Sequence, residues 1–142
     1  MSEGAKLENI GVFEANSEED TESEAPDISA GTGSVVEPEI VNKGTIERTE
    51  FDRFRGTTIG VKVANEGAIK VLSREGSLTF LGGGSSSAGS EWAIPEESSK
   101  VRLKGSSYSM SGSKWVGAGT LLIQTGVTAE GVEAQTGSVE LQ

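Results

Sequence analysis

Cysteine and histidine are both absent from this sequence, and each absence removes a class of chemistry. Without cysteine the chain has no disulfide framework, no thiolate nucleophile and no cysteine-bearing zinc or iron–sulfur site. Without histidine it lacks the commonest general base, the usual nucleophilic triads and the commonest metal ligand. No signal peptide and no run of about 18 apolar residues is recognisable, so we expect neither a secreted nor a membrane-spanning chain.

Basic residues are also scarce, and the resulting charge is unevenly placed. The 142 residues carry a net charge of −10, and residues 1–40 account for all of it with eleven acids and one base, Lys6. Residues 41–142 carry eleven acids and eleven bases. This pattern predicts an acidic N-terminal arm, residues 1–40, joined to a neutral body, residues 41–142. It disfavours nucleic acid as a partner, because phosphate contacts need a basic surface.

The expected arm has two apolar islands separated by a polar spacer. Residues 14–34 are rich in Glu, Ser and Gly, and such a segment buries too little apolar surface to offset its ordering entropy. Before it, the stretch KLENIGVFEA contains four candidate anchors for a partner: Leu7, Ile10, Val12 and Phe13. After it comes VVEPEIV at 35–41. We expect an extended arm that reaches beyond its own domain.

The body has the pattern of an all-β domain. Alternating apolar and polar residues predict short strands at 57–64, 68–72, 77–81, 100–104, 107–111, 119–125, 131–135 and 138–141. NEG at 65–67 and SREG at 73–76 are typical of hairpin turns, and GGGSSSAGSE at 82–91 of a polar loop. No internal repeat could be aligned. The expected fold is a small antiparallel β-sandwich or barrel.

No motif indicates catalysis, a cofactor or a metal ion. The Gly-rich stretch GGGSSSAGS is followed by Glu91 and not by the Lys-Ser/Thr of a phosphate-binding loop. No calcium-loop spacing occurs. The adjacent Glu96 and Glu97, and the pair Ser98 and Lys100, do not form a recognisable catalytic pattern. We therefore expect a protein that binds and assembles, and not an enzyme.

Two further sets of residues are candidates for binding. Three aromatic residues could form an exposed sugar-stacking platform, although core packing is the favoured interpretation: Trp92, Tyr108 and Trp115. Basic residues gather in two places that could receive the acidic arm of a neighbouring copy, the alternative being an ordinary solvated face: Arg48, Arg53, Arg55, and Lys100, Arg102, Lys104.

A small β body, an acidic arm with apolar anchors and Gly/Ser-rich loops together resemble the capsid decoration (cement) proteins of tailed viruses. The resemblance lies in architecture and composition and covers the whole chain. It implies a virion structural protein, made in the host cytoplasm, whose arm docks on the major capsid protein or another structural protein and on neighbouring copies. A tail-tube or head–tail connector subunit and a carbohydrate-binding or adhesive module remain alternatives.

Overall fold

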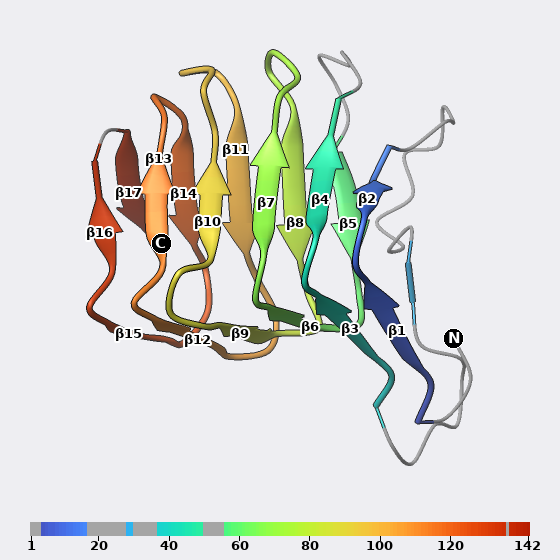
Figure 1. Ribbon diagram of the computed structural model, residues 1–142. Helices are drawn as coiled ribbons and strands as arrows, with labels where there is room; N and C mark the ends of the chain where they lie inside the picture. Colours follow the sequence, from blue (N-terminus) through green and yellow to red (C-terminus); the bar gives the residue numbers. More distant parts are fainter. Residues whose placement is uncertain (1–3, 17–27, 30–36, 50–55, 136) are drawn as a thin grey trace.

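Strands dominate the computed structural model, as the alternating sequence predicts, and all pairings between the named strands are parallel. The structure describes residues 4–16, 28–29, 37–49, 56–135 and 137–142. The strands lie in three sheets that run side by side along one axis (Figure 1). Within these described ranges the chain contains no helix.

Each sheet takes one strand from each successive coil of the chain. Sheet A holds six strands: β1 (Lys6–Asn9), β3 (Glu39–Asn42), β6 (Lys62–Asn65), β9 (Gly84–Ser86), β12 (Tyr108–Ser111) and β15 (Val127–Glu130). Sheet B holds six: β2 (Val12–Glu14), β4 (Thr45–Arg48), β7 (Ala68–Val71), β10 (Glu91–Ala93), β13 (Lys114–Val116) and β16 (Glu133–Ala134). Sheet C holds five: β5 (Gly56–Ile59), β8 (Ser77–Phe80), β11 (Lys100–Leu103), β14 (Thr120–Ile123) and β17 (Ser138–Leu141).

The fold is therefore a β-solenoid, and the prediction of an antiparallel sandwich or barrel is wrong. A coil such as β6–β7–β8 visits all three sheets, and the next coil, β9–β10–β11, lies directly over it. Consecutive strands belong to different sheets, so they never pair with each other. Strands occur at each predicted position, but predicted strand 57–64 is split between β5 and β6, and the predicted loop 82–91 contains β9. Four further strands of the body were not predicted: β4, β10, β13 and β15.

The turn at NEG shows why the hairpin interpretation failed. Glu66 and Gly67 form a corner between β6 in sheet A and β7 in sheet B, and Gly67 does not have a positive φ. Glycine is needed there for a different reason: a Cβ on Gly67 would lie 2.1 Å from the carbonyl oxygen of Gly44 in the preceding coil. Gly44 stands in the same relation to Gly11. These glycines let the backbones of successive coils stack closely at the corner.

An internal repeat does exist, contrary to the sequence analysis. The motif Asn-x-Gly recurs at residues 9–11, 42–44 and 65–67, each time at the corner between sheets A and B. Asn42 pairs with Asn9 on one side and with Asn65 on the other in the strand register. In the later coils Ser90 and Ser113 occupy the position of Gly67. The sequence motif is therefore not kept in these coils, although the backbone follows the same path.

The core lies inside the three sheets and is built of columns of side chains that stack from coil to coil. One column in sheet B is Phe13, Ile46, Ile69, Trp92, Trp115 and Ala134. A column in sheet C is Ile59, Phe80, Leu103, Ile123 and Leu141. Stacking residues of one kind in register lets each coil bury its apolar side chains against the next.

The expected boundary between arm and body is also corrected. β1 pairs with β3 and β2 pairs with β4, so residues 6–14 form the first coil of the solenoid. Ile28 makes an isolated parallel bridge to Ile59 and so takes the place of a sheet C strand in that coil. The boundary at residue 40 falls within β3. Residues 17–27 and 30–34 of the spacer predicted at 14–34 lie outside the described residues, and so do residues 35–36 of the second apolar island.

Candidate interaction surfaces

The loops considered for catalysis lie at an exposed corner between sheets B and C. Ser98 accepts a hydrogen bond on its Oγ from the backbone N–H of Glu75 at 3.1 Å, and Arg74 Nε lies 3.8 Å from a carboxylate oxygen of Glu96. Together with Glu97 these residues line a shallow hollow open to solvent. Across the described ranges, no three carboxylates come close enough together to hold a metal ion.

The three aromatic residues are buried, so the exposed platform is wrong and the favoured core packing is correct. Trp92 lies edge-on to Tyr108 with ring centroids 5.8 Å apart and stacks on Trp115 at 6.5 Å. The indole N–H of Trp92 donates to Ser86 Oγ at 3.1 Å. Parallel stacking forced this burial, because β10 and β13 place both tryptophans in one inward column.

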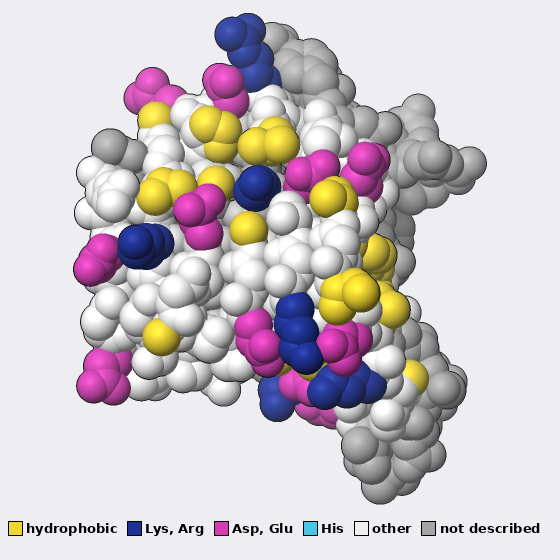
Figure 2. All heavy atoms as spheres, viewed as in Figure 1, with side chains coloured by type: hydrophobic (Ala, Val, Ile, Leu, Met, Phe, Trp, Pro, Cys, Tyr) yellow, Lys and Arg dark blue, Asp and Glu magenta, His cyan; other side chains and the backbone are white. Residues whose placement is uncertain are grey.

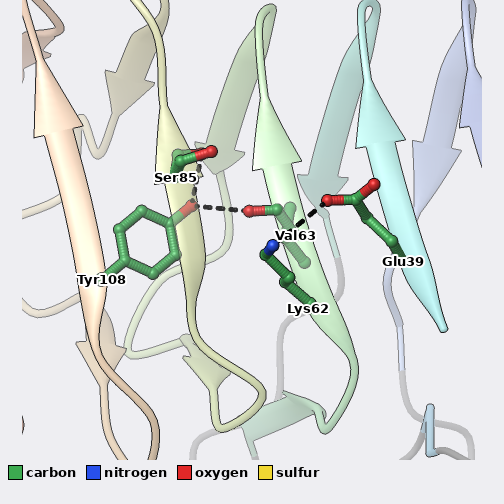
Figure 3. Close-up of polar contacts among 5 residues, drawn as sticks. All are labelled: Glu39, Lys62, Val63, Ser85 and Tyr108. Carbon is green, nitrogen blue, oxygen red and sulfur yellow. Dashed lines mark hydrogen bonds and ion pairs between the residues drawn. The ribbon is translucent and has the colours of Figure 1, made fainter. Parts of the chain in front are cut away.

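Tyr108 also points inward, and its hydroxyl is used within the fold. The hydroxyl donates to the backbone carbonyl of Ser85 at 3.2 Å and lies 3.5 Å from that of Val63 (Figure 3). Burial raises the pKa of this phenol well above its usual value, because the charged form would lose its hydration, and a hydrogen bond with Ser86 opposes the shift. No face of these rings is available to a sugar.

The first basic cluster does not form a surface patch. Arg48 is fully buried at the end of β4, and its guanidinium donates to Thr57 Oγ1, which in turn donates to the backbone carbonyl of Ala15 at 2.6 Å. The prediction that Arg48 receives an acidic arm is therefore wrong, since its side chain ties sheet B to sheet C inside the solenoid. Arg53 and Arg55 lie outside the described residues.

The second basic cluster is where the alternation predicted it. Lys100 and Arg102 project from the outer face of β11, and exposed Lys104 follows the strand. Their column neighbours are uncharged on β8, where Ser77 and Thr79 pair with Lys100 and Arg102. The cluster thus forms a basic strip on sheet C, and its role as a receptor for the arm stays a prediction.

The four predicted anchors lie together on the first coil. Leu7 and Val12 are 40% and 64% exposed, and Ile10, at the corner between them, is 80% exposed. Phe13 is half-buried against the core. β1 and β2 are each the last strand of their sheet, so their outer edges have no strand partner among the described residues. Apolar side chains and free backbone N–H and C=O groups therefore coincide at this end.

The opposite end of the solenoid also combines exposed apolar side chains with strand edges that have no partner among the described residues, and it was not predicted from the sequence. Val139 and Leu141 on β17 are 52% and 78% exposed although they occupy inward columns. Within the described ranges, five of the six exposed large apolar residues lie at the two ends, and the sixth is Leu72 on the flank. The alternation in SVEL predicted the strand, but only the stacking order reveals that no coil covers it.

The flank beside the first coil is polar and internally paired. Lys43 Nζ lies 2.7 Å from Glu8 Oε1, and this hydrogen bond, followed by charge attraction, lowers the pKa of Glu8 and raises that of Lys43. Lys62 lies 3.8 Å from Glu39 (Figure 3). Figure 2 shows acidic and basic side chains intermingled in the lower part of this face. Such a flank offers a partner little unpaired charge, so the ends are the better candidates for docking.

Comparison with known proteins identifies no relative. No protein family, no curated protein and no solved structure matches the chain. Within the described ranges, no helix has the length and apolar character needed to cross a membrane.

Proposed function

We propose that this chain is a non-enzymatic structural protein, an accessory subunit that docks on a larger protein assembly through its first coil. The observation that carries the proposal is the coincidence of Leu7, Ile10 and Val12 with β1 and β2, whose outer edges have no strand partner in the part of the chain that the structure describes. Apolar side chains beside an open strand edge suit β-strand addition, in which a partner contributes backbone hydrogen bonds and pockets. A virion surface, with the chain as a capsid decoration subunit, is the assembly we propose.

The solenoid suits such a role physically. Coil stacking places most of the exposed large apolar side chains of the described residues at the two ends of the solenoid, so docking would occur end-on. The acidic segment at 17–27 follows β2 in sequence and carries like charges that discourage non-specific association. A decoration subunit needs both a specific contact and a soluble exterior.

The test is co-purification with particles from the cells in which the chain is naturally made. Tagged wild-type chain should sediment with virus particles in a density gradient and stand in a fixed ratio to one lattice-forming protein. Ile10→Lys/Val12→Lys should abolish this association, because two charges would be placed at the docking edge.

Leu72→Lys is the matched control. Leu72 is 44% exposed on the flank, so its substitution also adds a positive charge and removes exposed apolar area, one residue in place of two, but leaves both ends intact. The control chain should remain with the particles. A wild-type chain that stays at the top of the gradient, or a first-coil variant that still sediments with particles, refutes the proposal.

A further inference from the structure

The last coil of the described chain has apolar inward positions that no further described coil covers. β15, β16 and β17 each end their sheet, and their inward positions are apolar: Val127, Ala129, Ala134, Val139 and Leu141. In every earlier coil of the described chain the equivalent positions are covered by the next coil. The last coil instead leaves three strand edges and these side chains open at the end drawn on the left of Figure 1.

We propose that this end receives the first coil of a second copy, so that copies stack head to tail and continue the same sheets. This deepens the proposed function, on which it rests for the use of the first coil as a docking element. The contact is heterologous: the tail of one copy meets the head of the next, and the stack as a whole keeps one free head and one free tail.

The register of the two ends supports this occupant. Leu7 begins the sheet A column that ends in Val127, and Phe13 begins the sheet B column that ends in Ala134. Ile28 bridges to Ile59 at the start of the column that ends in Leu141. A second copy displaced along the axis by its own length would place apolar residues against apolar residues in all three columns. The strands of the first coil would also run parallel to those of the last coil of the neighbouring copy, as all named strand pairs within the chain do.

Charge favours head-to-tail over tail-to-tail contact. Residues 126–142 contain three acids, Glu130, Glu133 and Glu140, and no base. Two tails meeting would therefore bring six carboxylates together. Among the described residues at the head, the charges of Lys6 and Lys43 balance those of Glu8 and Glu14, so this part of the head presents no excess of negative charge to a tail.

Sedimentation of the purified chain tests the inference without any other protein. The weight-average mass of the wild-type chain should rise with concentration. A tail variant, Val139→Lys/Leu141→Lys, and a head variant, Leu7→Lys/Val12→Lys, should each remain monomeric. Mixed in equal amounts they should form a species of twice the monomer mass and nothing larger, because the mixture has one working head and one working tail.

Leu72→Lys should assemble like the wild type. A monomeric wild-type chain overturns the inference, and so does a head variant that dimerises alone or a mixture that stays monomeric. The particle experiment gives an independent result. If the wild-type chain fails to self-associate but the tail variant still sediments with particles, stacking is refuted and the proposed function stands. A wild-type chain that self-associates but does not bind particles refutes the proposed function and leaves stacking standing.

Cysteine crosslinking tests the register and does not depend on disrupting an end. Glu8 and Thr128 are exposed and occupy one outward column of sheet A, so stacking would place Glu8 of one copy opposite Thr128 of the next. Neighbouring strands are about 4.8 Å apart, which is within disulfide range.

The chain has no cysteine of its own, so the background is clean. Oxidised Glu8→Cys/Thr128→Cys should give a ladder of oligomers on a non-reducing gel. Glu8→Cys/Ser138→Cys, whose second site lies in sheet C, should give at least tenfold less. Equal ladders, or none, would overturn the proposed register.

Discussion

The asparagine column permits a quantitative test of what holds the coils in register. Asn42 is fully buried and makes three hydrogen bonds: its Nδ2 donates to Asn65 Oδ1 at 2.7 Å and to the carbonyl of Ala68 at 2.9 Å, and its Oδ1 accepts from Asn9 Nδ2 at 2.7 Å. Asn65 is equally buried, but it only accepts the bond from Asn42, and its own Nδ2 has no partner among the described residues.

Replacing each asparagine with alanine therefore separates hydrogen bonding from burial. Both substitutions remove the same atoms from equally buried sites, so the cavity and transfer costs nearly cancel in the comparison. Asn42→Ala removes three hydrogen bonds and Asn65→Ala removes one. At about 1 kcal/mol for each bond, Asn42→Ala should lower the free energy of unfolding by about 2 kcal/mol more than Asn65→Ala does.

The assay is urea denaturation followed by far-ultraviolet circular dichroism and by fluorescence of the two buried tryptophans. The two probes should report one transition, and Asn42→Ala should shift its midpoint to lower urea than Asn65→Ala. If Asn65→Ala costs as much as Asn42→Ala, the column contributes through packing alone and the hydrogen-bond argument fails.

Three further predictions concern the corner, the core and the tyrosine. Gly44→Ala should lower the free energy of unfolding by about 1–3 kcal/mol, because its Cβ would lie 2.1 Å from the carbonyl oxygen of Gly11, whereas Gly126→Ala, with nothing within 4 Å, should be neutral in the same denaturation assay. Trp92→Ala should cost about 3–5 kcal/mol by urea denaturation, since it empties the centre of the aromatic cluster; a loss under about 1 kcal/mol would contradict the packing. Burial raises the pKa of Tyr108 in the folded chain, so its stabilising contribution is complete below the unfolded value of about 10 and is lost as pH rises above it. Ultraviolet titration of this single tyrosine should show ionisation only above pH 10 or together with unfolding, and a normal titration curve in folded chain would contradict its burial.

Much of the local structure could be predicted from the sequence, and the reason is the alternation of side chains. AIKVL and SLTFL place Ile69, Val71, Leu78 and Phe80 on one side of their strands, and all four are buried. Alternation depends only on the period of a strand, which is the same in parallel and antiparallel sheets. It therefore located strands well and gave no information on which strands pair.

The candidate sites were predicted less well, because exposure depends on pairing. Trp92 and Trp115 lie beside Gly/Ser-rich segments, which suggested loops, yet parallel stacking of β10 on β13 buries both. Arginine is usually exposed, but Arg48 is buried, and its guanidinium donates a hydrogen bond to Thr57 Oγ1. Leu7, Ile10 and Val12 are exposed as expected of the proposed anchors, and they were singled out because they are apolar within a polar stretch, a signal that does not depend on the fold.

The turn residues, and not the apolar ones, contained the information that distinguishes a solenoid from a meander. A hairpin turn uses glycine for a positive φ, and each hairpin needs it independently of the others. Here Asn42 and Gly44 are followed by Ile46, and Asn65 and Gly67 are followed by Ile69, with the same spacing. A polar residue, a glycine and a core residue that recur in fixed order indicate one environment met repeatedly, which is the property of stacked coils.

The Asn-x-Gly repeat ends where the column of asparagines in sheet A gives way to other residues. After Asn65 the equivalent position is Ser86, whose hydroxyl accepts from the Trp92 indole, so the interior passes from an amide column to an aromatic cluster. The first coils are thus held in register by hydrogen bonds and the middle coils by ring packing. In the last coil these two columns end in small side chains packed on one side only, Ala129 and Ala134. A coil with so little internal stabilisation gains most from a neighbour, which is why the tail is the end at which a second copy would bind.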